Sequence, residues 1–270
     1  MLIAQISDPH ITDDLHDLPV DPRMRLDTVI EHLNATSAGA PPLDLVVATG
    51  DLTNYGTAEE YRLLRSHLER IDARVLVLPG NHDDASLMRT ALTDYLPDTL
   101  TENHLSYVID DYPIRLVCLD TSLVGHPEGI FDDERATWLD TSLAASDTPT
   151  MLFMHHPAFD SGIEWMDGMS LTNKEEFAEI ISRHPQVGTV ASGHLHRCLT
   201  TRIAHAVATG APSTTHQLAL DLDPSRAALS LEPAGYLLHR WDGATLLTHA
   251  VTVGDYELLR MDHLTAHPPE

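Results

Sequence analysis

The stretch VLVLPGNHDD, residues 75–84, decides the fold of this chain. Its first half is an unbroken apolar run, which predicts a strand of a parallel sheet that is covered on both faces. Its second half, Gly80-Asn81-His82-Asp83, places an amide, an imidazole and a carboxylate directly after that strand. Polar groups are unfavourable beside a buried strand end unless they have partners. This end of the predicted sheet is therefore the first candidate for a functional site.

Four more predicted strands are followed by polar patterns of the same kind. The strands are expected at Leu2–Ser7, Leu43–Thr49, Thr150–Met154 and Val187–Ser192, and the patterns are Asp8-Pro-His10, Gly50-Asp51-Leu-Thr-Asn54, His155-His156-Pro157 and Gly193-His194-Leu-His196. In open α/β sheets, the carboxyl ends of the strands form the binding crevice. We therefore expect these loops to converge on one spot, although each pattern alone is common in proteins.

The side chains of these loops are typical ligands of divalent metals. Carboxylate, imidazole and amide oxygen suit first-row ions, and the loops offer no thiolate. Asp8 and His10 are two positions apart, so both would leave the same face of an extended chain, and the same holds for His194 and His196. The glycines at positions 50, 80 and 193 are expected to let the backbone turn sharply. The loops offer at least seven ligands of these types, which is more than one ion needs. Two ions that share a carboxylate are therefore predicted.

The remaining pattern predicts alternating strands and helices, followed by a strand-rich end. Helices are expected at about residues 23–36, 57–70, 84–92, 133–145 and 172–183, and two of them begin with the capping boxes Thr57–Glu60 and Thr172–Glu175. Hairpins are expected within 104–120 and, around an Asp-Gly turn, at 240–245. The irregular stretch 157–171 is expected to be an ordered loop near the site, whereas 266–270 are expected to fray.

The composition excludes several classes of partner. The 270 residues include 41 Asp and Glu but 16 Lys and Arg, for a formal net charge of −25, which repels long nucleic acids and anionic membranes. No run of about 18 apolar residues predicts a membrane span, and the N-terminus does not resemble a secretory signal. Cys118 and Cys198 do not indicate a disulfide scaffold, so the expected compartment is the cytoplasm.

In this order the motifs resemble those of the calcineurin-like metallophosphoesterases, and most closely the bacterial branch of class III cyclic-nucleotide phosphodiesterases and metal-dependent glycerophosphodiesterases. The resemblance implies an α/β fold: a four-layer α/β/β/α sandwich with two mixed β-sheets and a strand-rich C-terminal extension. It also implies a catalytic core over residues 1–203. Strands over residues 204–270 would complete the second sheet and form a dimerisation or cap region, within a single domain overall.

The resemblance further implies two divalent or mixed-valent metal ions, drawn from iron, manganese, zinc and cobalt. The first metal would be bound by Asp8, His10 and His196, the second by Asn81, His155 and His194, and Asp51 would bridge the two. His155 is preferred to His156 because, in the family, the histidine directly after the strand is the ligand. His156 would then support the ligands or be structural.

Four further residues have candidate roles by resemblance. His82 would lie near the leaving-group oxygen, where it, or a water it holds, would act as the general acid. Asp83 would orient His82, cap the following helix, or do both. Asn54 would bind a phosphoryl oxygen or serve as a turn residue. His216 would reach back to the metal site, as in glycerophosphodiesterase-like members, or lie on a surface loop.

Together these features predict a hydrolase of small phosphodiesters, either cyclic nucleotides or glycerophosphodiesters, acting by in-line attack of a hydroxide that bridges the metals. The family resemblance also implies a homo-oligomer, a dimer or higher. No arginine follows Gly50-Asp51-Leu-Thr in the way it does in protein phosphatases of this superfamily, which argues against that class. One alternative is a phosphomonoesterase or nucleotidase on the same metal core. Another is a non-catalytic scaffold, which is disfavoured because all seven ligands are present.

Overall fold

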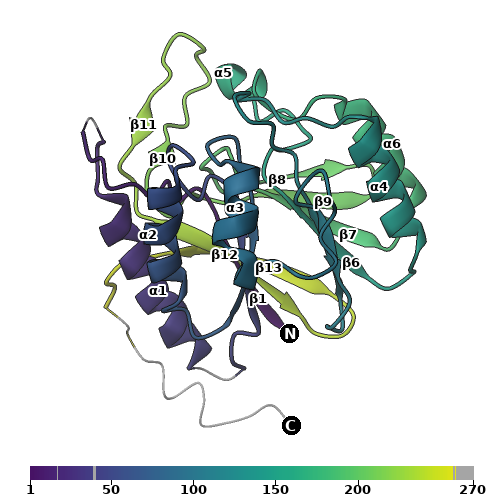
Figure 1. The fold of residues 1–270 in the computed structure, drawn as a ribbon, viewed down its shortest axis with the longest axis horizontal. Helices are drawn as coiled ribbons and strands as arrows, with labels where there is room; N and C mark the ends of the chain where they lie inside the picture. Colours follow the sequence, from purple (N-terminus) through teal and green to yellow (C-terminus); the bar gives the residue numbers. More distant parts are fainter. Residues whose placement is uncertain (17, 39–40, 258, 260–270) are drawn as a thin grey trace.

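Two β-sheets pack face to face, and helices cover the outer face of each (Figure 1). The computed structural model describes the chain except for residues 17, 39–40, 258 and 260–270, so the predicted fraying of 266–270 lies outside the described residues. Both sheets combine parallel and antiparallel strands. The predicted four-layer α/β/β/α sandwich with two mixed sheets is confirmed.

The first sheet has the order β13-β12-β1-β2-β3. Its strands are β1 (Leu2–Ile6), β2 (Leu45–Thr49), β3 (Arg74–Leu78), β12 (Gly235–Trp241) and β13 (Leu246–Thr252). The first three are parallel, whereas β12 pairs antiparallel with β1. The helices on its outer face are α1 (Pro22–Ser37), α2 (Ala58–Leu68) and α3 (Ala85–Ala91), and the turn η1 (Thr93–Tyr95) follows α3.

The second sheet has the order β4-β5-β6-β7-β9-β8. Its strands are β4 (Tyr107–Ile109), β5 (Arg115–Leu119), β6 (Thr150–Met154), β7 (Val187–Ser192), β8 (Leu199–Ile203) and β9 (Ala206–Gly210). The helices α4 (Asp133–Ala144) and α6 (Lys174–Arg183) cover its outer face, and the short α5 (Glu164–Asp167) lies before α6. A two-stranded arm, β10 (Gln217–Leu218) and β11 (Leu229–Ser230), projects beyond both sheets (Figure 1).

The core is a sandwich of three buried apolar layers, because each sheet is apolar on both faces. One layer lies between the first sheet and α1 to α3, one between the two sheets, and one between the second sheet and α4 and α6. Tyr107 is fully buried between the sheets, and its hydroxyl donates to the carbonyl of Val77 at 2.8 Å. That bond satisfies the one polar group that the tyrosine brings into the core.

The N-termini of two helices show when the local sequence determines the helix cap and when it does not. The capping box at α2 is present, because Thr57 accepts from the N–H of Glu60 and the Glu60 carboxylate accepts from the N–H of Thr57. The second predicted capping box is wrong. Thr172 accepts from the N–H of Phe131 instead, and Asn173 is the N-cap with a φ of 51° and no capping hydrogen bond from its side chain. Tertiary contacts with a distant loop have replaced the local cap.

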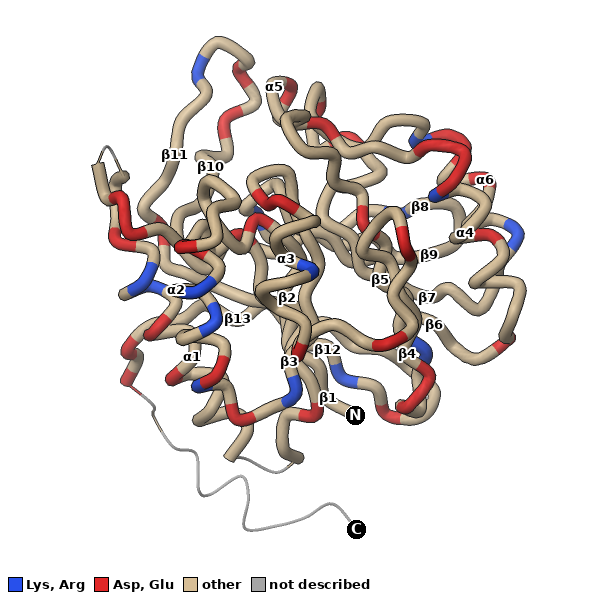
Figure 2. The backbone as a smooth tube through the Cα atoms, in the orientation of Figure 1, with Lys and Arg blue, Asp and Glu red and all other residues tan. Residues whose placement is uncertain are grey.

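The C-terminal strands contribute to both sheets. β9 extends the second sheet beside β7, whereas β12 lies beside β1 in the first. The boundary at residues 203 and 204 falls between β8 and β9, which pair with each other, and the division there stays a prediction. Acidic residues are spread over the outer helices and loops (Figure 2). No helix in the described part of the chain is long and apolar enough to cross a membrane.

Candidate metal centre and active site

The loops that follow β1, β2, β3, β6 and β7 meet at one edge of the sandwich, as the strand-end argument predicted. The backbone of Asp8 donates to Gly50 O at 3.0 Å and that of His10 donates to Asp51 O at 2.9 Å, which joins the first two loops. The expected extended geometry is wrong. Left-handed φ values occur at Asp8 (54°), His10 (46°), Asp51 (48°), His194 (67°) and His196 (46°). Such conformations are unfavourable by about 1–3 kcal/mol each and cluster at functional sites.

The glycines of these loops are needed for two different reasons. Gly50 has a φ of 93°, so it provides the expected sharp turn. Gly80 and Gly193 do not have positive φ, so glycine is not required there by the backbone conformation. They allow close approach instead: a Cβ on Gly80 would collide with the Asp51 side chain, and one on Gly193 would collide with Ser7. Close packing of the loops therefore depends on the absent side chains.

One group of candidate ligands gathers around Nε2 of His155. Its Nδ1 atom lies 2.8 Å from the carbonyl oxygen of Thr49 and donates to it, because a carbonyl only accepts. Nε2 then lies 3.2 Å from Oδ1 of Asn81 and 3.4 Å from Oδ1 of Asp51. Burial lowers the pKa of His155, but the carboxylates of Asp51 and Asp8 and the carbonyl of Thr49 together outweigh burial and raise it to about 9. A positive charge is thus strongly favoured between these atoms.

A second group gathers around Nε2 of His196. Its Nδ1 atom donates to the carbonyl oxygen of His216 at 2.8 Å, which directs Nε2 toward the other ligands. Nε2 lies 3.2 Å from Oδ1 of Asp8 and 3.2 Å from Nε2 of His10. His10 Nε2 is in turn 3.8 Å from Oδ2 of Asp51. The two oxygens of Asp51 therefore face different groups, as a bridging carboxylate requires.

His194 completes the donor set. It is buried, its Nε2 has no hydrogen-bond partner within the described residues, and its backbone N–H donates to Asp8 at 3.2 Å. Burial lowers its pKa to about 3, so the ring stays neutral. A neutral, buried imidazole without a partner is costly unless it binds a cation. The residues present therefore fit two divalent ions that share Asp51.

His155 and His156 are distinguished by what their ring nitrogens contact. His156 is also buried near His194, with ring centroids 4.8 Å apart. Its Nδ1 lies 2.9 Å from the hydroxyl of Thr121, on the side of the second sheet. Its Nε2 has no partner in the described chain, so geometry leaves it able to bind a metal. His155 is favoured because it alone of the two contacts Asp51 and Asn81.

His82 and Asn54 lie at the rim of the cluster. His82 is exposed, its Nδ1 donates to the carbonyl of Asn54 at 2.8 Å, and its ring meets that of His10 edge-on at 4.7 Å. That bond leaves Nε2 as the nitrogen that a substrate can reach. The side chains of both residues line the cavity above the histidines. Their positions are compatible with both substrate-binding predictions.

Asp83 has neither of its predicted roles. The N-cap of α3 is Asp84, and His82 is oriented by Asn54 rather than by Asp83. The buried carboxylate of Asp83 accepts hydrogen bonds from five donors, namely Leu52 N, Thr53 N, Thr53 Oγ1, Gly80 N and Tyr61 Oη. Burial raises its pKa to about 6. Asp83 thus holds the loops after β2 and β3 together beneath the site.

His216 lies at the cluster rather than on a surface loop. Its ring stacks on that of His10 with centroids 5.5 Å apart and lies 4.9 Å from that of His196. Two hydroxyl groups attach the segment before His216 to the loop after β1. Ser213 donates to Asp8 O at 2.8 Å, and Thr215 donates to Pro9 O at 2.7 Å. No sequence motif predicted these two hydrogen bonds. Burial lowers the pKa of His216 to about 4.

A cavity of about 360 Å³ opens over the cluster, and about half of its lining lies outside the motifs. The lining residues outside the motifs are Leu18, Pro127, Trp165, Met166, Met169, Leu218 and Leu229. The ordered loop expected at 157–171 supplies three of them through α5 and its flanks. The only signal in the sequence was the Met and Trp content of that loop.

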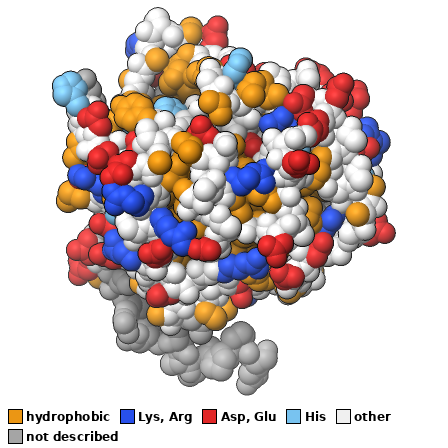
Figure 3. Space-filling model, viewed as in Figure 1, with side chains coloured by type: hydrophobic (Ala, Val, Ile, Leu, Met, Phe, Trp, Pro, Cys, Tyr) orange, Lys and Arg blue, Asp and Glu red, His pale blue; other side chains and the backbone are white. Residues whose placement is uncertain are grey.

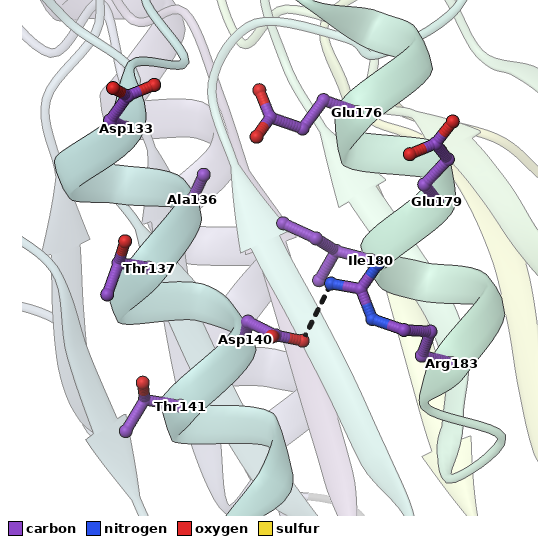
Figure 4. A pocket seen from close by; sticks show the side chains of 9 residues that line it. All are labelled: Asp133, Ala136, Thr137, Asp140, Thr141, Glu176, Glu179, Ile180 and Arg183. Carbon is purple, nitrogen blue, oxygen red and sulfur yellow. Dashed lines mark hydrogen bonds and ion pairs between the residues drawn. The ribbon is translucent and has the colours of Figure 1, made fainter.

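Another hollow, between α4 and α6, differs in chemistry (Figure 4). Asp133, Glu176 and Glu179 line it without any histidine, and Asp140 pairs with Arg183 at 3.0 Å. Within the described residues, the clusters of His, Asp, Glu or Cys that can hold an ion all belong to the strand-end loops and the His216 segment. The acidic groove between the helices is therefore not the metal centre.

Comparison with known proteins agrees with this geometry. A model of the calcineurin-like phosphoesterase family matches residues 1–198. A probable glycerophosphodiester phosphodiesterase from Arcobacter nitrofigilis is 38% identical over 264 residues, which cover 95% of each chain. A probable cyclic nucleotide phosphodiesterase from Synechococcus is 30% identical over 240 residues, covering 86% of this chain and 88% of the relative. The solved structure of a dimetal phosphatase from Danio rerio superposes with a TM-score of 0.62 at 14% identity, over 94% of this chain and 99% of its own.

Proposed function

Because the chain belongs to the calcineurin-like phosphoesterase family, we propose that it is a dinuclear-metal phosphodiesterase that hydrolyses glycerophosphodiesters. The observation that carries this proposal is the position of Asp51, whose two oxygens face the His155 group and the His10 group. We assign Asp8, His10 and His196 to one metal, Asn81, His155 and His194 to the other, and Asp51 to both. Iron, manganese, zinc and cobalt all suit this donor set.

The chain's own residues supply positioning and proton transfer. When bound, two divalent ions would supply Lewis-acid polarisation of the phosphoryl oxygens and a water that ionises near neutral pH. His82 holds one proton at Nδ1 through Asn54 O, and as an imidazolium it can deliver a second from Nε2 to the departing alkoxide. The Asn54 amide can donate to a phosphoryl oxygen. His216 closes the side of the site next to His10 and His196.

Glycerophosphodiesters are preferred to cyclic nucleotides because of the comparisons. The relative named for glycerophosphodiesters is more similar to this chain and covers more of it than the one named for cyclic nucleotides. The described cysteines, Cys118 and Cys198, are free thiols, which supports a reducing compartment such as the cytoplasm. A homo-oligomer remains a proposal from family resemblance.

A substrate panel tests the proposed function. Metal-loaded protein should hydrolyse bis(p-nitrophenyl) phosphate faster than p-nitrophenyl phosphate, and glycerophosphodiesters faster than cyclic AMP. A preference for the monoester would favour the phosphomonoesterase alternative. Protein that binds no metal and stays inactive with added manganese or cobalt would favour the scaffold. A preference for cyclic AMP would keep the diesterase and change its substrate.

A further inference from the structure

Much of the lining of the cavity above the histidines is apolar. This part of the lining, the apolar wall, consists of Leu18, Trp165, Met166, Met169, Leu218 and Leu229. None of these side chains carries a carboxylate, amide or hydroxyl group, and no Lys or Arg among the described residues lines the cavity. The wall therefore suits a substrate group that requires no hydrogen bonds, while the phosphoryl group lies over the metal ligands.

Part of the apolar wall is packed against a ligand loop. Met166 and Leu218 are buried in one cluster with Leu195, which lies between two of the candidate ligand histidines in the sequence. The carboxylate of Asp167 accepts hydrogen bonds at 2.7 and 2.9 Å from backbone N–H groups of the turn before α5. Trp165, which is half-buried, is thus presented to the cavity by an ordered segment.

The electrostatic setting of the wall favours a cation. The chain has a formal net charge of −25, and such a field attracts positively charged groups. Hydrophobic side chains gather at the top of the face shown in Figure 3, over β10, β11 and α5, where few basic side chains are seen. An aromatic side chain with apolar neighbours in a negative field is suited to bind a quaternary ammonium group.

We propose that the apolar wall binds the quaternary ammonium head of a choline-type phosphodiester, with Trp165 as the specificity-determining residue. The proposal rests on the phosphodiesterase function and specifies its substrate class. A primary ammonium needs hydrogen-bond acceptors, and a nucleobase needs polar partners at its edges, which the wall side chains do not offer apart from the indole N–H. A trimethylammonium group needs neither, and its methyl groups can pack against the side chains of Met169 and Trp165.

Three glycerophosphodiesters test this assignment: the choline ester, the ethanolamine ester and the neutral 3,3-dimethylbutyl ester, which has the shape of choline without its charge. The native enzyme should prefer the choline ester to both others. Trp165→Leu should lower kcat/KM for the choline ester about tenfold, mainly through KM, because the cation–π contact is lost. The loss for the other two esters should be several-fold smaller. Trp138→Leu, which lies at a different hollow beside His104, is the matched control.

Equal rates on the choline and dimethylbutyl esters would overturn the cation assignment, and an equal loss on all three esters in Trp165→Leu would show a merely structural role. A second measurement does not depend on catalysis. Tetramethylammonium should quench tryptophan fluorescence in the native protein but not in Trp165→Leu, and absence of that difference would also overturn the proposal. If no diester is hydrolysed, the proposed function has failed, and the fluorescence titration still decides whether the wall binds the cation.

Discussion

The backbone N–H of His82 donates a hydrogen bond to Oδ1 of Asp51 at 2.8 Å. This bond joins the candidate general acid to the carboxylate that faces both groups of ligands. The same oxygen lies 3.4 Å from His155 Nε2, so the two strand-end loops share one anchor. Metal content and activity therefore have to be measured together for variants of this site.

Separate replacement of the two adjacent histidines tests the ligand assignment. His155→Ala should lose one metal per chain, because its Nε2 faces the oxygens of both Asn81 and Asp51. His156→Ala should retain both metals, because the Nδ1 of His156 contacts Thr121 instead. Elemental analysis of the purified variants gives the stoichiometry. The reverse pattern would make His156 the ligand.

His82→Asn tests the general acid. Both metals should be retained, while kcat for a diester with an alkyl leaving group should fall about 100-fold or more, since the departing alkoxide needs a proton. The loss should be much smaller with a p-nitrophenolate leaving group, which departs without protonation. His249→Asn, at an exposed histidine on β13 that does not line the cavity, is the control. Equal losses for both leaving groups would rule out the acid role.

Asp83→Asn and Asp84→Asn form a matched pair on adjacent residues. In Asp83→Asn, the new amide group would face backbone N–H donors of Leu52, Thr53 and Gly80, so the free energy of unfolding should fall by about 2–4 kcal/mol. Asp84→Asn should change it by less than about 0.5 kcal/mol, because Asn caps helices as well as Asp. Urea denaturation measures both, and similar values for the two variants would contradict the five-donor role of Asp83.

His239 should make stability depend on pH. Burial between Thr248 and Gln5 lowers its pKa from 6.5 to about 3 in the folded chain. Below pH 6.5 the unfolded chain therefore binds a proton that the folded chain does not, and the free energy of unfolding falls as pH falls toward 3. His239→Gln should reduce this slope by up to about 1.4 kcal/mol per pH unit. Urea denaturation from pH 4 to 7 checks it, and identical slopes would contradict it.

The local parts of the fold could be predicted from the sequence because their determinants are neighbours in the chain. The apolar runs predicted β1, β2 and β3, and the Thr57–Glu60 box predicted the start of α2. The second capping box failed because Phe131, far away in the sequence, binds Thr172 and Asn173. A four-residue pattern contains no information about a contact with a residue that is distant in the sequence.

The sequence by itself determined which side chains follow which strands, and hence that imidazoles and carboxylates would gather at one edge of a sheet. Only the tertiary structure decided how they meet. Left-handed backbone at Asp8 and His196, rather than extended chain, directs their side chains to one point. The sequence predicted an ordered loop near the site at 157–171, but only the packing of β10, β11 and α5 over the histidines decided which side chains form the apolar wall. Backbone strain and contacts between distant loops depend on sheet order and packing, which the periodicity of a single chain does not encode.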